Sequence, residues 1–100
     1  MKDLNNKCKI AVVQAAPVMF DKDLCTKKAV SLIQEASKNK SELIVFPELF
    51  IPGYPYGMTF GFTVGSRNAD GRKDWKMYYD NSILVPGVET ECIGQAAKKA

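Results

Sequence analysis

Hydrophobic residues first gather in a short, nearly continuous run over residues 9–15 (KIAVVQA), and a second run of the same kind covers residues 43–46 (LIVF). Pro17 follows the first run and Pro47 the second. Short apolar runs rich in β-branched residues are typical of strands that are buried on both faces of a sheet. We therefore expect two inner strands at these places.

The residues between the two runs follow helical spacing. Asp21 or Asp23 can cap the start of a helix, and residues 38–40 provide a cationic last turn and a stop signal. Apolar residues recur between these ends at helical intervals, as Cys25, Ala29, Leu32, Ile33 and Ala36. Strand, helix and strand within about 40 residues predict a βαβ unit with parallel strands, and hence a layered α/β fold.

A loop rich in glycine, proline and aromatic residues follows Pro47. All seven glycines lie beyond residue 52, and Pro52 and Pro55 interrupt any regular element. Glycines recur every four residues from Gly53 to Gly65, a pattern shared with packed membrane helices. Pro55 and the short span favour a shaped loop instead, in which glycine permits positive φ and close backbone packing.

Helical spacing returns over residues 70–80, where Trp75, Tyr78 and Tyr79 fall on one side. A turn at residues 86–87 then precedes a last helix over residues 92–100.

The predicted elements make an incomplete sheet. No capping signal closes the last helix, and two parallel strands alone would leave both sheet edges open. We expect residues 1–8 to be flexible, and residues 9–100 to be the N-terminal part of a domain that is truncated at its C-terminal end.

Composition excludes several functions. The 100 residues include no histidine, which removes Ser-His-Asp and Cys-His catalysis and the commonest zinc ligand from this chain. The net charge is only +3, and the basic residues within residues 67–76 alternate with acids, so a solvated face is favoured over a nucleic-acid surface. No apolar run approaches the roughly 20 residues of a membrane helix. We therefore expect neither nucleic acid nor membrane as a partner.

The three cysteines, Cys8, Cys25 and Cys92, form no C-x-x-C pair, which favours a reducing cytoplasm over a disulfide framework or a zinc site. Cys25 lies on the apolar side of the first helix, where inert packing is favoured. Cys92 opens the last helix, but Glu89 and Glu91 beside it oppose a thiolate. No cysteine has a base in its local sequence.

Glu48 is the strongest candidate for chemistry. It lies just past the second predicted strand, and parallel sheets place their ligands at the carboxyl ends of strands. Its apolar neighbours would shelter the carboxylate and favour its protonated form, as a general acid or base requires. A solvent-facing loop glutamate is the alternative. Tyr54 and Tyr56 can line a pocket or pack in the core.

Residues 46–55 (FPELFIPGYP) resemble the nitrilase branch of the carbon–nitrogen hydrolase superfamily. Residues 9–17 resemble the opening strand of that family, and residues 57–67 resemble a segment typical of plant-type nitrilases and their bacterial relatives. With the VPG sequence at residues 85–87, this ordered series extends over residues 9–100, which is far more specific than one short motif.

The resemblance implies an α-β-β-α sandwich and a Glu-Lys-Cys site that needs no metal or cofactor. In the family a cysteine thiolate attacks the nitrile carbon to form a thioimidate, and water then releases ammonia and the carboxylic acid. Glu48 corresponds to the general base that takes the thiol proton, and Tyr54 to a residue that lines the substrate pocket near the nucleophile. The lysine and the nucleophilic cysteine of the family lie beyond residue 100, and no cysteine of this chain stands in a matching motif.

We therefore expect the N-terminal part of a cytoplasmic, homo-oligomeric nitrilase that acts on small-molecule nitriles. A cyanide hydratase or dihydratase, or an amidase of the same superfamily, is the alternative enzyme. A catalytically dead truncated chain that acts only by association with full-length subunits is the non-enzyme alternative, suggested by the open sheet edges. A general α/β binding module would leave the FPELFIPGYP sequence unexplained.

Overall fold

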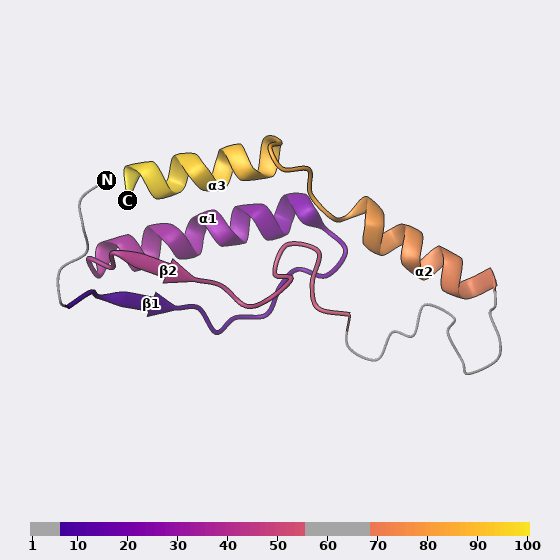
Figure 1. Cartoon of the computed structure of the whole chain (residues 1–100), viewed down its shortest axis with the longest axis horizontal. Coiled ribbons are helices and arrows are strands. Elements are labelled where there is room, and N and C mark those ends of the chain that lie inside the picture. The colour runs from indigo at the N-terminus through magenta and orange to yellow at the C-terminus, as the bar shows by residue number, and fades with distance from the viewer. Residues whose placement is uncertain (1–6, 56–68) are drawn as a thin grey trace.

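The computed structural model describes residues 7–55 and 69–100 of the chain. Within these residues the elements, in chain order, are β1 (Ile10–Val12), α1 (Lys22–Lys38), β2 (Leu43–Val45), α2 (Ala69–Asp80) and α3 (Val88–Lys99) (Figure 1). The strands lie inside the two apolar runs but are shorter than these runs, because regular pairing ends before each proline.

The two strands pair in parallel, with Ile10 opposite Leu43 and Val12 opposite Val45. The Val13 N–H extends the ladder by donating to the Val45 carbonyl at 2.8 Å. Because α1 connects the two parallel strands, the predicted βαβ unit is confirmed.

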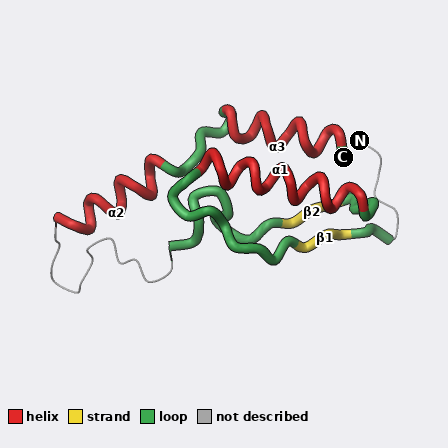
Figure 2. The backbone as a smooth tube through the Cα atoms, turned by 180° about the vertical axis from the view of Figure 1, so that it is seen from behind, coloured by secondary structure: helices red, strands yellow, loops and turns green. Residues whose placement is uncertain are grey.

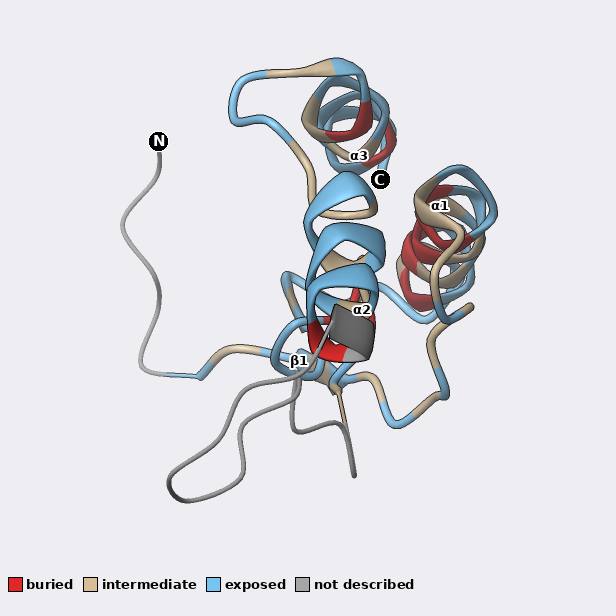
Figure 3. Ribbon diagram, turned by 90° about the vertical axis from the view of Figure 1, so that its right-hand side faces the viewer, coloured by how far each residue is buried: buried red, intermediate tan, exposed pale blue. Residues whose placement is uncertain are grey.

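Helices α1 and α3 lie side by side, and in Figures 1 and 2 α1 lies between α3 and the strand pair. The facing sides of the two helices carry buried residues (Figure 3). At their N-terminal ends, the Lys22 ammonium lies 3.8 Å from the Glu89 carboxylate. The core contains Cys25, Ala29 and Phe50, with Val18, Leu32, Phe46, Ile51 and Ile93 packed against it. Helix α1 thus holds both α3 and the segment that follows β2.

The other face of the strand pair is open in the part of the chain that the structure describes. Ile10, Val12, Leu43 and Val45 are all between 45% and 76% exposed. The prediction that the strands are buried on both faces is therefore wrong for this chain. The physical reason is that alternate strand residues point to opposite faces, and the described helices cover one of them.

Helix α1 follows its predicted pattern closely. Asp21 is the N-cap, because its carboxylate accepts a hydrogen bond from the Leu24 N–H at 3.0 Å. Asp23 lies inside the first turn. The predicted apolar side is buried except for Leu32, which is partly buried, and Thr26 is buried beside it.

The predicted common side of aromatic residues on α2 is divided by the fold. Trp75 and Tyr79 stack with ring centroids 5.0 Å apart and are both exposed. Tyr78 instead meets the ring of Phe20 edge-on, with centroids 6.5 Å apart. Spacing alone could not separate these residues, because positions three and four apart share one broad helix face.

Helix α3 begins at Val88, four residues before the predicted start. The Thr90 hydroxyl accepts a hydrogen bond from the Gly87 N–H at 2.9 Å, which caps this end. Cys92 therefore lies exposed within the helix, and the prediction that it opens the helix is wrong.

The surface of α2 carries Lys76 paired with Asp80, while Arg72 and Lys73 are exposed. Arg67 lies outside the described residues. None of the helices in the described segments is both long and apolar enough to span a bilayer.

Replacing Asp21 with alanine tests the capping assignment. Asp21→Ala removes the acceptor of the Leu24 N–H and is expected to lower the free energy of unfolding by about 1 kcal/mol. The matched Asp23→Ala variant loses only a favourable charge in the first turn, about 0.3–0.5 kcal/mol. Urea unfolding followed by circular dichroism measures both, and a larger loss for Asp23→Ala would contradict the assignment.

Candidate active site

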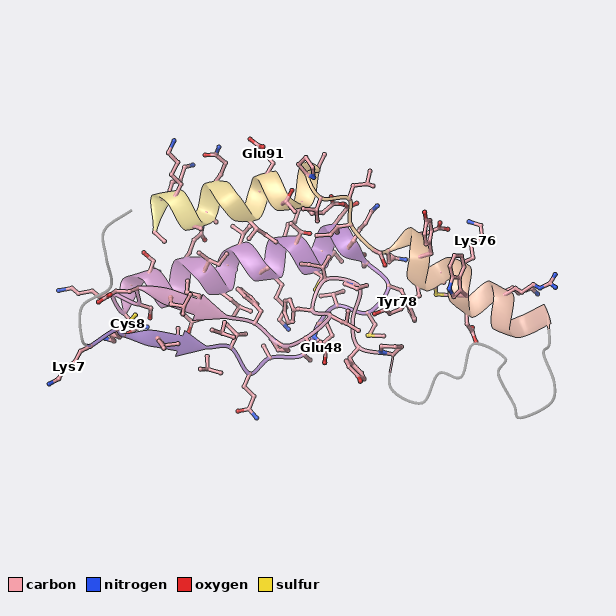
Figure 4. All side chains as sticks on the ribbon, viewed as in Figure 1. Lys7, Cys8, Glu48, Lys76, Tyr78 and Glu91 are labelled. Atoms are coloured by element: carbon pink, nitrogen blue, oxygen red, sulfur yellow. The ribbon has the colours of Figure 1, made fainter. Side chains whose placement is uncertain are left out.

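Glu48 lies three residues after the end of β2, at the carboxyl end of the parallel pair (Figure 4). Phe50, two residues further on, is 6% exposed, and its ring lies 5.3 Å from that of Phe46. Glu48 itself is exposed. The expectation that its apolar sequence neighbours shelter the carboxylate is wrong within this chain, because Phe50 turns into the core instead of over Glu48.

The backbone after Glu48 turns sharply. Leu49 has φ +53° and Gly53 has φ +88°, and the Gly53 N–H donates to the Leu49 carbonyl at 2.9 Å. Leu49 is therefore a non-glycine residue in the left-handed region, directly after the candidate acid. Gly53 is constrained by space as well, since a Cβ there would lie 2.1 Å from the Met19 sulfur.

This turn places Glu48 and Tyr54 on the same cavity, whose volume is about 390 Å³. Its lining consists of Ala15, Pro17, Pro47, Glu48, Phe50 and Tyr54. The residues come from the two segments that follow β1 and β2, so the cavity lies where both parallel strands end. It combines apolar side chains with one carboxylate and one phenol. Tyr56, the other tyrosine considered for a pocket, lies outside the described residues.

Tyr78, which the sequence analysis grouped with Trp75 and Tyr79, has a distinct electrostatic environment. Burial raises the pKa of the Tyr78 phenol, and the charges of Tyr54 and Glu48 raise it further. The helical spacing of Tyr78 did not predict this environment, because the same spacing places it with Trp75 and Tyr79. The edge contact with Phe20, 58 residues earlier in the chain, arises only in the folded molecule.

None of the three cysteines lines the Glu48 cavity. The Cys25 thiol is fully buried and donates to the Phe50 carbonyl, with the sulfur 3.2 Å from the oxygen. Burial raises the pKa of the Cys8 thiol, and the charge of Glu42 and a hydrogen bond to it act in the same direction. The environment of Cys8 therefore opposes thiolate formation.

The described residues do not meet the requirements of a metal site. Within residues 7–55 and 69–100, no three cysteine, aspartate or glutamate side chains lie together in a way that could hold a metal ion.

The chain belongs to the carbon–nitrogen hydrolase family, because the family model of that description matches residues 9–100. Within the family its relatives are nitrilases, which confirms the resemblance to the nitrilase branch. It is 45% identical over 94 residues to the aliphatic nitrilase of Sinorhizobium fredii (strain HH103) and 44% identical over 88 residues to nitrilase 2 of Arabidopsis thaliana. It is 41% identical over 88 residues to the bifunctional nitrilase/nitrile hydratase NIT4B of Nicotiana tabacum.

The alignment with the Sinorhizobium fredii nitrilase covers 94% of the chain, and the alignments with the Arabidopsis thaliana and Nicotiana tabacum relatives each cover 88% of it. They cover only 30%, 26% and 25% of the relatives. The chain therefore spans between a quarter and a third of the length of the proteins it matches.

Substituting Gly53 tests the turn that carries Tyr54. Gly53→Ala places a side chain at positive φ and against the Met19 sulfur, so we expect a loss of at least about 1–2 kcal/mol in the free energy of unfolding. Gly94 is the matched control, since a Cβ there meets nothing within 4 Å. Gly94→Ala lies inside α3 and should raise stability by about 0.5–1 kcal/mol. Denaturant unfolding compares the two, and a harmless Gly53→Ala would show that the turn does not need glycine.

Proposed function

We propose that this chain supplies the general base of a nitrilase, and that Glu48 is that base. The observation that carries the proposal is the shared cavity. Glu48 and Tyr54 line one hollow at the carboxyl ends of two parallel strands, in a chain 41–45% identical to nitrilases. In the family a lysine and a cysteine complete this site, and no cysteine of this chain stands in a matching motif.

The chemistry assigns a specific task to the Glu48 carboxylate. A thiol with an ordinary pKa of about 8.5 is mostly protonated near neutral pH, so it needs a base before it can attack. Glu48 takes the thiol proton, and the thiolate then adds to the nitrile carbon and forms a thioimidate. Water attacks the thioimidate and ammonia leaves; a second water then releases the carboxylic acid and restores the thiol. The lysine ammonium stabilises the charge that develops on the nitrile nitrogen.

The exposure of Glu48 fits a site that more than one part of the protein builds. The outer face of the strand pair is apolar and open, which supports an α-β-β-α sandwich in which further sheet structure packs there. Further structure beside the cavity would exclude water from the Glu48 carboxylate and strengthen its interaction with the thiol. The fold thus leaves Glu48 accessible to the nucleophile that must reach it.

Release of the amide is a second possible outcome at the same site. The tobacco relative is named as both nitrilase and nitrile hydratase, so the intermediate on this protein can partition between acid and amide. A cyanide hydratase or an amidase would differ in substrate, and product analysis with nitriles, cyanide and amides separates all of these.

Glu48→Gln tests the base directly in the full-length protein. The amide keeps the size of the side chain but cannot accept the thiol proton, so we expect turnover of nitriles to fall by a factor of about 10²–10⁴. The melting temperature should not change, because Glu48 is exposed. Glu91→Gln on the exposed side of α3 is the control and should keep full activity. Full activity of Glu48→Gln would remove Glu48 from the mechanism.

The 100-residue chain by itself should release no ammonia from a nitrile. The Cys25 thiol is buried, the raised pKa of Cys8 opposes its thiolate, and Cys92 is not part of the cavity lining. Ammonia release from a panel of aromatic and aliphatic nitriles measures this. Activity that is retained in Glu48→Gln would come from a contaminant, whereas activity that Glu48→Gln abolishes would refute the prediction.

A further inference from the structure

Helix α1 holds both of the segments that build the Glu48 cavity. The segments that follow β1 and β2 run alongside α1 toward the end where that helix begins (Figure 1). On the β2 side, the Cys25 thiol donates to the Phe50 carbonyl at 3.2 Å. On the β1 side, the Lys28 ammonium donates to the Ala16 carbonyl at 2.6 Å. Because Cys25 and Lys28 are three residues apart, one turn of α1 reaches both segments.

The Ala16 carbonyl lies at the centre of the cavity wall that follows β1. Ala15 and Pro17, on either side of it in the chain, both line the cavity. The hydrogen bonds of the strand pair end before this wall. In the part of the chain that the structure describes, the bond from Lys28 is the one hydrogen bond to the backbone of residues 14–17. The strand ladder therefore does not position this wall, whereas Lys28 contacts it directly.

The wall after β1 also touches the turn that carries Tyr54. Met19, two residues after Pro17, packs against Gly53, since a Cβ on that glycine would lie 2.1 Å from the Met19 sulfur. The Gly53 N–H in turn closes the turn just before Tyr54. A displacement of the first wall would therefore reach the second one.

The chemistry of Lys28 suits the task of holding a backbone carbonyl. An ammonium has three N–H donors and no acceptor, and a bond from a charged donor is stronger than one between neutral groups. Lys28 is partly buried, so its apolar stem lies along the protein while its charged end meets the Ala16 oxygen.

We propose that Lys28 is a positioning residue that sets the width of the Glu48 cavity, by holding the Ala16 carbonyl and with it the wall formed by Ala15 and Pro17. This inference rests on the proposed function of the cavity as a nitrile site. Neither alanine nor proline carries a reacting group, so this wall contributes to binding rather than to the chemical step. Lys28 thus selects nitriles by the space that the wall leaves for the group attached to the nitrile carbon.

A surface lysine without this task makes a different prediction. If the contact with Ala16 does not hold the wall, its removal changes neither the affinity for nitriles nor the preference among them. Lys28→Met removes the charged donor and keeps a long unbranched side chain. Lys27→Met is the matched control, because Lys27 is the exposed neighbour on α1 and its ammonium forms no ion pair within the described residues.

The kinetic experiment compares the two variants in the full-length protein. It uses two nitriles of different bulk that the wild type hydrolyses, such as propionitrile and benzonitrile. For Lys28→Met we expect KM for the smaller nitrile to rise about three- to tenfold while kcat changes less than about twofold, since the loosened wall no longer fits around it. The ratio of kcat/KM for the larger nitrile to that for the smaller one should rise at least about threefold.

Three kinetic results would overturn the proposal. The first is a Lys28→Met enzyme with wild-type KM values and wild-type preference between the two nitriles. The second is the same change in Lys27→Met, because it would show an effect of charge on α1 in general. The third is a fall in kcat with unchanged KM, because it would place the effect on the chemical step.

Crystal structures of the full-length wild type and of both variants test the contact without any need for activity. We expect residues 15–17 to move away from α1 in Lys28→Met and to keep their position in Lys27→Met. An unchanged position of residues 15–17 in Lys28→Met would show that Lys28 does not hold the wall, and the proposal would fail.

The two experiments distinguish the two possible failures. A wild-type protein that hydrolyses no nitrile would refute the nitrilase proposal, and with it the selection of nitriles by Lys28. A wild-type protein that hydrolyses nitriles and loses activity in Glu48→Gln, but keeps its KM values and its preference in Lys28→Met, would refute only the positioning inference.

Discussion

The packing of Phe50 against α1 is the interaction on which the rest of the structure depends. Phe50 lies in the core with Cys25 and Ala29, and the Cys25 thiol donates to its carbonyl at 3.2 Å. This contact ties the segment after β2 to the helix that connects the two strands. Because Glu48 is only two residues from Phe50, the position of the candidate base is set by a buried anchor rather than by its own contacts.

The backbone conformation around Phe50 explains how the segment after β2 positions Glu48 and Tyr54. Leu49 and Gly53 both have positive φ, and the Gly53 N–H closes the turn on Leu49. The turn sends Phe50 into the core and leaves Glu48 and Tyr54 at the rim of one cavity. A non-glycine residue in this conformation costs free energy, which the burial of the Phe50 ring offsets.

Helix α2 divides its aromatic residues between two environments. Trp75 and Tyr79 stack on each other in solvent, so their contact is local to the helix. Tyr78 is held by Phe20 and lies where the charges of Glu48 and Tyr54 affect its phenol. The exposed face of the strand pair, in contrast, contributes no residue to the cavity.

The sequence by itself determined the elements whose signals are local. Helix α1 follows from the spacing of Cys25, Ala29 and Ile33 and from the cap at Asp21. The two β-branched runs predict the strands of the parallel pair. Both signals are local, because side-chain period and capping act over a few residues. The motif around Glu48 was likewise enough to indicate the family. Only the tertiary structure decided which side chains are covered. Phe50 rather than Glu48 is buried, one face of the strand pair is open, and Tyr78 packs against Phe20 while its neighbours Trp75 and Tyr79 stay exposed. Burial and long-range contact depend on what the chain brings together from distant positions, and no local pattern encodes that.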